Sequence, residues 1–346
     1  MKPLIKCEIQ YFPSPHLSQL YVGFETLRKN GVIDLVIKPF SGDPFKPLLH
    51  VKVNDKYNVI YDTLDGFFWI HDLEKPNLQH FKEQIKADYY FKRSFNQKIK
   101  DFAPENCEVH PLGFNYPMSA NFDSTNLSIK DRLKNTYVYK KYLTNTFNPN
   151  DFEYYPVPNN KTRIVFITRL WDPKTASLSH LQDRWKKMNE KRMNVAKSLK
   201  KEFGSIATVG VQKSNYSSQV CDKDLLLDSE FSKRKNFLKL IKQSNICVAT
   251  NGLHNSIGWK FGEYIAASRA IVSEELVYET TGDFENEKNY LAFTNEEELI
   301  NNISFLCKDK NALQRMMRHN YSYYHNFLRP DILILNTLLK ITEREL

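Results

Sequence analysis

A turn followed by a short helix has residue types that suit ligand binding. The stretch "HNSIGWKFGEYIAAS" (254–268) follows "NICVAT", an apolar run typical of a buried strand. Asn251 and Gly252 let the chain turn, and Gly258 lets a ligand approach the backbone closely. The free N–H groups at the start of a helix form a seat for phosphate. We therefore predict phosphate binding by a loop that contains Gly252, His254, Asn255, Ser256, Ile257 and Gly258.

Glu263 is the one carboxylate of this stretch, and it lies about one and a half turns into the predicted helix. A carboxylate set back in this way would not face the phosphates directly, so it is spared most of their repulsion. It can instead accept hydrogen bonds from a ribose diol. The alternative is that Glu263 caps the helix or forms an ion pair within the fold.

Two cations flank the end of another apolar run, in "RIVFITRLWDPK" (163–174). Arg169 and Lys174 lie on either side of a sharp exit from a predicted strand, and Asp172-Pro173 is a turn pair. Together they could clamp a diphosphate through charge-assisted hydrogen bonds, each contributing about 1.5–3 kcal/mol. A surface turn with incidental charges is the alternative for this motif taken alone.

Taken together, the two motifs resemble those of the GT-B glycosyltransferases, particularly the retaining group 1 class. That class carries R-L-x-x-x-K after the first strand of its C-terminal domain, as Arg169 to Lys174 do here. It also carries E-x7-E with a glycine three residues in, a spacing matched by Asn255, Gly258 and Glu263. The resemblance covers about residues 161–330. It implies a sugar-nucleotide donor in the C-terminal domain, an acceptor on the N-terminal domain and a C-terminal helix that crosses back.

Asn255 departs from the family pattern, because the family's first glutamate contacts the donor sugar and an amide carries no charge. Retention of configuration is therefore not carried over to this chain. An inverting mechanism needs a base from the N-terminal half. His16 follows the first predicted strand, and Asp65 follows the strand "YNVIYD". Both are candidate bases, with a loop or capping role as the alternative for each.

Basic residues exceed acidic ones by 49 to 40, which gives a formal net charge of +9 and favours an anionic partner. The densest basic stretch, Arg184 to Lys201, has Trp185, Met188, Val195 and Leu199 on one face of a predicted amphipathic helix. A solvated helix face is the simplest interpretation, and a phosphate-facing or membrane-facing role is the alternative. Aromatic residues do not alternate with these lysines, so nucleic acid is not an expected partner. Lys92 and Arg93, in "FKRSFN", either meet an anionic acceptor or are solvated.

Strands alternate with helices along the chain, which predicts an α/β fold with parallel sheets. A looser segment at 123–151 and the cluster from Pro156 to Asn160 then separate two such units. We predict two Rossmann-like domains facing across a cleft. The first is acceptor domain 1–155, the second is donor domain 156–328, and helix 329–346 crosses back. The predicted strands are 4–12, 32–40, 57–62, 87–93, 107–114, 163–170, 206–211, 245–250 and 270–275, and the predicted helices are 16–31, 184–201, 231–244 and 259–268.

These observations predict an enzyme, a glycosyltransferase with a nucleotide-sugar donor and a saccharide or lipid-linked acceptor, active in surface polysaccharide or glycan assembly. No metal or other cofactor is expected. Five scattered cysteines without a CxxC pair and an N-terminus with Lys6 and Glu8 predict a cytoplasmic protein. It could be peripheral on the inner face of a membrane. The alternatives are a sugar-nucleotide epimerase, which would need no acceptor, and a non-catalytic nucleotide- or nucleic-acid-binding protein with a steep salt dependence.

Overall fold

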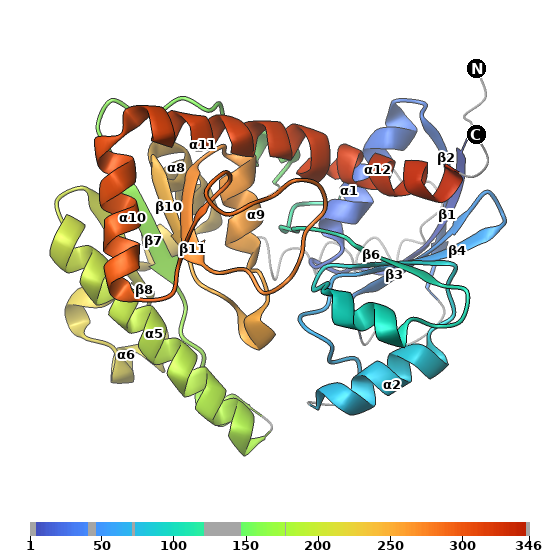
Figure 1. Cartoon of the computed structure of the whole chain (residues 1–346), viewed down its shortest axis with the longest axis horizontal. Helices are drawn as coiled ribbons and strands as arrows, with labels where there is room; N and C mark the ends of the chain where they lie inside the picture. Colours follow the sequence, from blue (N-terminus) through green and yellow to red (C-terminus); the bar gives the residue numbers. More distant parts are fainter. Residues whose placement is uncertain (1–4, 41–45, 71–72, 121–146, 177, 344–346) are drawn as a thin grey trace.

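The computed structural model describes residues 5–40, 46–70, 73–120, 147–176 and 178–343. In these residues two six-stranded sheets lie side by side, each with helices around it (Figure 1). The first sheet contains β1 (Ile5–Tyr11), β2 (Ile33–Pro39), β3 (Leu48–Val53), β4 (Tyr57–Asp62), β5 (Tyr89–Lys92) and β6 (Glu108–Pro111). The second contains β7 (Ile164–Thr168), β8 (Ala207–Gln212), β9 (Leu226–Leu227), β10 (Ile246–Ala249), β11 (Ala270–Glu274) and β12 (Leu291–Phe293). The predicted α/β class with two Rossmann-like units is thus found.

Helices α1 to α9 occupy connections between strands, as alternating patterns predict, and α10, α11 and α12 follow the last strand. The α-helices are α1 (Ser18–Lys29), α2 (Glu74–Gln84), α4 (Pro149–Phe152), α5 (Ser179–Phe203), α6 (Ser217–Val220), α7 (Ser229–Ser232), α8 (Arg234–Gln243), α9 (Trp259–Ala266), α10 (Glu296–Lys308), α11 (Lys310–Tyr323) and α12 (Pro330–Thr342). Short 3-10 helices are η1 (Gln97–Phe102), η2 (Pro173–Thr175), η3 (Lys223–Leu225) and η4 (Leu253–Asn255), and η5 (Tyr324–Leu328) is a π-helix.

The second sheet is parallel throughout, in the order β12-β11-β10-β7-β8-β9. Its central strands β7 and β10 are neighbours, and both are completely buried and apolar except for Thr168 at the end of β7. Since parallel neighbours end at the same edge of a sheet, the segments after β7 and β10 emerge beside each other. This edge brings the two predicted ligand-binding motifs together.

The first sheet differs from the prediction in one strand. Its order is β2-β1-β3-β4-β5-β6, and β3 runs antiparallel to both of its neighbours. No strand was predicted between the strands expected at 32–40 and 57–62, where β3 lies. The strand forms a hairpin with β4 through Asn54 and Asp55, both with positive φ, and such residue pairs suit hairpin turns. Other differences are local: the helix predicted at 231–244 is interrupted at Lys233, between α7 and α8, and the edge strands β9 and β12 were not predicted.

The C-terminal helix α12 lies on α1, across from the second sheet (Figure 1). A Cβ atom on Gly23 of α1 would lie 2.2 Å from the carbonyl oxygen of Pro330, so only glycine permits this close approach. Tyr61 and Thr337 share a buried hydrogen bond of 2.7 Å between β4 and α12. The chain thus returns to the first sheet after passing through the second, while the residue boundaries of the two predicted domains stay a prediction.

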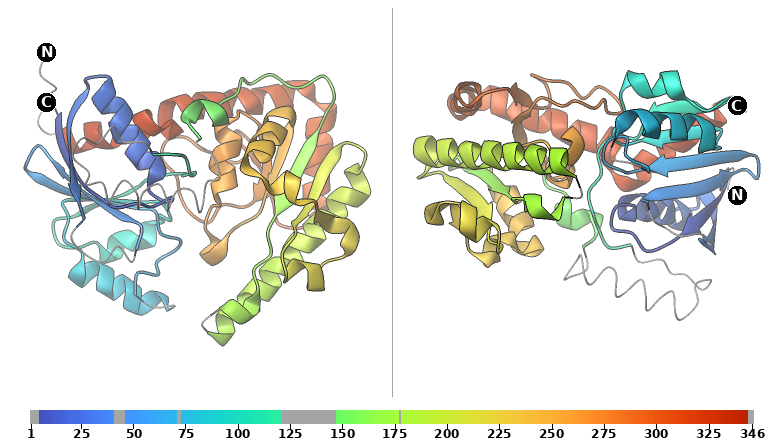
Figure 2. Two further views of the ribbon diagram at one scale, coloured as in Figure 1. Left: turned by 180° about the vertical axis from the view of Figure 1, so that it is seen from behind. Right: turned by 90° about the horizontal axis from the view of Figure 1, so that it is seen from below.

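Helix α5 extends well beyond the edge of the second sheet at its N-terminal end, as the view from behind shows (Figure 2). Val195, Ala196 and Leu199 are buried in its C-terminal half. The looser segment predicted at 123–151 lies largely outside the described residues, which resume at 147.

Candidate functional site

The loop after β10 has an unusual backbone at the place predicted to bind a ligand. His254 and Asn255 both have a φ of 57°, in the left-handed region that residues other than glycine adopt rarely. The N–H of Gly252 donates to the carbonyl of Ser256 at 2.7 Å, and a Cβ on Gly252 would lie 2.8 Å from the Ser256 Oγ. Strained backbone of this kind is found mainly where function requires a fixed loop shape.

Gly258 is the residue immediately before helix α9. No side chain caps this helix end, and the first N–H groups of a helix lack the carbonyl partners that later ones have. Gly258 is exposed, and no heavy atom lies within 4 Å of the position that a Cβ would take. The backbone is therefore accessible to a ligand here. Ser256 and Ile257, in contrast, are buried.

Arg169 and Lys174 lie at the carboxyl end of the neighbouring strand β7 and are both exposed. The guanidinium of Arg169 lies 3.9 Å from the centre of the Trp171 ring, a cation–π contact that holds the side chain at the strand exit. Lys174 belongs to the short helix η2, whose first turn is capped by the Asp172 carboxylate at 3.0 Å from the Lys174 N–H. Both cations therefore follow β7 at the same sheet edge from which the loop leading to α9 emerges.

Arg192 joins the two strand exits, a role that the sequence analysis missed. This buried residue of α5 donates to the carbonyl of Arg169 at 2.7 Å and to that of Asn251 at 3.0 Å. Burial lowers its pKa to about 10. Its position between Met188 and Val195, on the apolar face of the predicted helix, was the available signal. Lys260 of α9 acts similarly by donating to the carbonyl of Ile167, and burial lowers its pKa to about 8.

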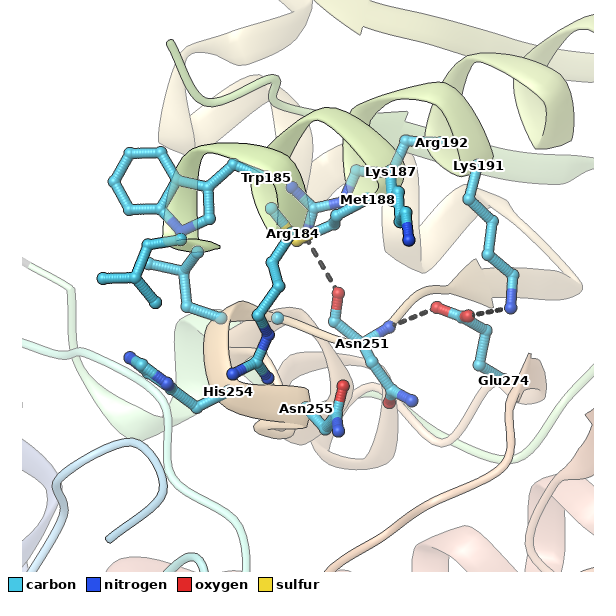
Figure 3. A pocket seen from close by; sticks show the side chains of 13 residues that line it. Arg184, Trp185, Lys187, Met188, Lys191, Arg192, Asn251, His254, Asn255 and Glu274 are labelled. Atoms are coloured by element: carbon cyan, nitrogen blue, oxygen red, sulfur yellow. Dashed lines mark hydrogen bonds and ion pairs between the residues drawn. The ribbon is translucent and has the colours of Figure 1, made fainter. Parts of the chain in front are cut away.

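A pocket of about 300 Å³ lies between α5 and the loop after β10 (Figure 3). Its walls bring together part of the predicted loop and the basic face of α5. The lining residues are Leu181, Arg184, Trp185, Lys187, Met188, Lys191, Arg192, Asn251, Gly252, Leu253, His254, Asn255 and Glu274. The predicted residues Gly252, His254 and Asn255 are among them, whereas the other predicted donor residues lie outside this lining.

Glu263 lies behind the loop and is almost fully enclosed, with 1% of its side chain exposed. Its Oε1 lies 2.9 Å from the guanidinium of Arg234 on α8, and neither carboxylate oxygen accepts a well-oriented hydrogen bond from a described residue. Arg234 also donates to the carbonyl of Pro117 at 3.0 Å and contacts the ring of Phe152. This is the ion pair that the alternative interpretation predicts, and the ribose role stays a prediction.

The candidate bases His16 and Asp65 lie close to each other and reach the second half of the chain. The His16 ring contacts the Trp259 ring edge-on at 4.8 Å, directly after Gly258. Burial lowers the pKa of His16, Arg93 lowers it further, and Asp65 partly opposes them. Burial would raise the pKa of Asp65, but Arg93, a hydrogen bond from Ser256 and His16 together hold it below its ordinary value.

Arg93 is an interdomain contact rather than a solvated or acceptor-binding cation, which corrects the interpretation of "FKRSFN". It is 4% exposed, forms an ion pair with Asp65 and donates to the carbonyl of Ile257 at 2.8 Å. The Phe68 and His254 rings also meet across this boundary, with centroids 3.9 Å apart. The first sheet's loops therefore touch the predicted donor loop directly.

Lys92 is equally enclosed and holds the loop that carries Asp65. Its Nζ lies 3.2 Å from the Asp62 carboxylate, with both side chains fully buried, and it donates to the carbonyl of Leu64 at 2.8 Å. Tyr90 and Trp69 donate to the same Asp62 oxygen at 2.5 and 2.8 Å. Burial lowers the pKa of Lys92 to about 8, and Asp62 opposes this shift. This network of satisfied polar groups thus holds the loop that carries Asp65 in place.

Among the described residues, no cluster of three or more His, Cys, Asp or Glu side chains has metal-binding geometry. None of the described helices combines the length and apolar character needed to cross a bilayer.

No protein-family model and no curated protein matches this chain. Solved structures do match it. WaaG, a glycosyltransferase involved in lipopolysaccharide biosynthesis, is 8% identical with a TM-score of 0.44, over 95% of this chain and 96% of that one. Anabaena HepE in complex with UDP and glucose is 12% identical with a TM-score of 0.44, over 96% and 98%.

A third match is the C-terminal domain of a group 1 glycosyl transferase (LpcC) from Francisella tularensis, 12% identical with a TM-score of 0.34. It covers 52% of this chain and 96% of that domain. These names agree with the resemblance seen in the sequence. Because the TM-scores lie below 0.5, we base the proposed function on this chain's own residues.

Proposed function

We propose that this protein is a glycosyltransferase that moves a sugar from a nucleoside-diphosphate sugar to a saccharide or lipid-linked acceptor, in the assembly of a surface polysaccharide or another glycan. One observation carries the proposal. Arg169 and Lys174 follow β7, the Asn255–Gly258 loop follows its parallel neighbour β10, and Arg192 bonds to both exits. Ligands of open α/β sheets bind at this edge.

The donor diphosphate is proposed to lie between the two exposed cations and the N–H groups at the start of α9. Arg169 and Lys174 supply charge-assisted hydrogen bonds, and the uncapped helix end adds its positive dipole. These groups compensate the diphosphate charge without a metal ion. Asn255 then contacts the donor sugar through its amide, and Glu263 holds the ribose diol.

The acceptor is proposed to approach from the first sheet. Of the two candidate bases there, His16 suits proton abstraction better than Asp65, because Asp65 is paired with Arg93 and bonded to Ser256. The His16 Nδ1 is buried and has no hydrogen-bond partner among the described residues. An imidazole that is neutral at pH 7 can accept the proton of an acceptor hydroxyl.

Arg169→Ala and Lys174→Ala are each expected to weaken binding of the donor's nucleoside diphosphate by about 10- to 100-fold, because each removes one charge-assisted hydrogen bond. A thermal-shift screen of the wild type against nucleoside diphosphates and sugar nucleotides identifies the donor first. A free ligand concentration of 100 times the Kd adds about 2.7 kcal/mol of stability. Titration of the two variants with that donor follows.

The control variant is Lys161→Ala. It also removes one positive charge, from an exposed lysine that precedes β7. It should bind the donor as the wild type does. Wild-type affinity in both Arg169→Ala and Lys174→Ala would remove the clamp. A wild type that no sugar nucleotide stabilises would remove the proposed function.

The basic surplus leads us to propose peripheral binding at the cytoplasmic face of an anionic membrane, where lipid-linked acceptors are found. The protein is then expected to co-sediment with vesicles that contain anionic lipid and not with neutral vesicles. Each added basic contact contributes about 1 kcal/mol, and moderate salt should weaken binding. Equal binding to both vesicle types, or none, would favour a water-soluble acceptor.

A further inference from the structure

The α5 wall of the pocket carries positive charge that the proposed donor site does not use. Arg184, Lys187, Lys191 and Arg192 line it, and Glu274 is the one carboxylate in the lining. Lys191 is neutralised by its ion pair with Glu274. Arg184 and Lys187 are exposed, and neither forms an ion pair with a described residue. Two unpaired cations therefore face one small pocket.

Arg192 is the buried cation of the pocket lining. It is 7% exposed, and its two outer nitrogens donate to the carbonyls of Arg169 and Asn251. Its Nε is buried and has no hydrogen-bond partner among the described residues. An unpaired buried donor is costly for a protein, and a ligand anion would satisfy it. Arg184 extends from α5 toward the loop that carries His254 and Asn255 (Figure 3).

The pocket takes in only part of the proposed donor site. The pocket lining ends at Asn255 and does not include Gly258, Arg169 or Lys174. A Cβ atom on Gly258 would have no heavy atom within 4 Å, so this backbone stays open to the diphosphate. Asn255, the proposed contact of the donor sugar, belongs to the pocket. In the proposed function, an anion held by α5 would therefore lie beside the donor sugar, where the acceptor meets it.

We propose that the acceptor is a phosphorylated saccharide whose phosphate binds Arg184, Lys187 and Arg192. This inference rests on the proposed function. Trp185 and Met188 offer an apolar wall for a sugar ring beside the cations, and about 300 Å³ is within the range of small-ligand sites. Arginine matches the geometry of phosphate oxygens, and lysine adds a point charge.

The test is calorimetric titration of glucose 6-phosphate, with glucose, glucuronate and inorganic phosphate as comparison ligands. The wild type should bind glucose 6-phosphate most tightly and glucose least. The double variant Arg184→Ala/Lys187→Ala should bind glucose 6-phosphate about 10- to 100-fold more weakly, because two charge-assisted contacts are lost. Lys197→Ala/Lys201→Ala is the matched control, since it removes two exposed charges of α5 outside the pocket. It should bind within about twofold of the wild type.

The nucleoside diphosphate is titrated into the same proteins and should bind all of them equally. Loss of its affinity in Arg184→Ala/Lys187→Ala, with competition by glucose 6-phosphate, would assign the pocket to the donor and overturn the proposal. Equal weakening in the control would reduce the effect to general surface charge, and glucuronate binding as tightly as glucose 6-phosphate would overturn the choice of phosphate. If no nucleoside diphosphate binds the wild type, the proposed function fails, whether or not the sugar phosphate binds.

Discussion

Replacing His16 by alanine is expected to lower kcat by about 100- to 10,000-fold, the usual contribution of a general base. The nucleoside diphosphate should bind this variant as it binds the wild type, because His16 belongs to the first half of the chain. Its ring lies beside Trp259 at the start of α9, close to the proposed diphosphate site, and its Nδ1 has no partner among the described residues. Steady-state kinetics with the donor and acceptor measure the loss.

The pH profile separates a base from a packing residue. Burial lowers the pKa of His16 below its ordinary value, so the neutral, proton-accepting form predominates at pH 7. The rate should therefore be constant near neutrality and fall only when the pH drops through this lowered pKa. His16→Ala should lose that acidic limb, and Asp65→Asn should keep it. Full activity of His16→Ala, or an acidic limb that survives in it, would exclude this role.

The parts of the site that are contiguous in sequence could be predicted. The strands before Arg169 and Asn251 are short apolar runs bounded by turn residues, and both are buried strands in the structure. Gly252 indicates a tight turn, and Gly258 indicates an accessible helix start; both follow from the small size of glycine. Such features depend on neighbours within a few residues, and those neighbours are visible in the sequence.

The buried cations could not be predicted in the same way. Arg93 and Arg192 look like surface residues, because charged side chains are seldom buried without a partner. Besides the Asp65 carboxylate that pairs with Arg93, their partners include the backbone carbonyls of Ile257, Arg169 and Asn251, which belong to loops distant in sequence. A carbonyl exists at every residue, so the sequence gives no signal of which ones the fold leaves available.

Strand β3 shows a second limit. Its alternation "LLHVKV" and the Asn54-Asp55 pair are a hairpin signal, yet regular strand–helix alternation along the rest of the chain favoured parallel strands everywhere. The antiparallel pairing of β3 with both β1 and β4 replaces a helical crossover. A fold-level expectation here overrode a correct local signal.

Glu263→Ala is expected to lower the free energy of unfolding by about 3–5 kcal/mol, the cost of leaving one partner of a buried ion pair uncompensated. Arg234 would keep its charge in a site where 19% of its side chain is exposed. Urea denaturation measures the change. Replacing both partners, as in Arg234→Leu/Glu263→Leu, should restore most of the lost stability, because neither charge then remains buried.

Donor binding then separates the two roles of Glu263. If its carboxylate also holds the ribose diol, Glu263→Ala loses about 1–3 kcal/mol of nucleoside-diphosphate binding, and Glu263→Gln loses less. The double variant should regain stability but not this affinity, because a leucine accepts no hydrogen bond. Asn255→Ala is the matched comparison: it should bind the nucleoside diphosphate normally and the full sugar nucleotide weakly. Wild-type affinity in a folded Arg234→Leu/Glu263→Leu protein would show that Glu263 serves the fold alone, since its carboxylate would then be dispensable to the ribose.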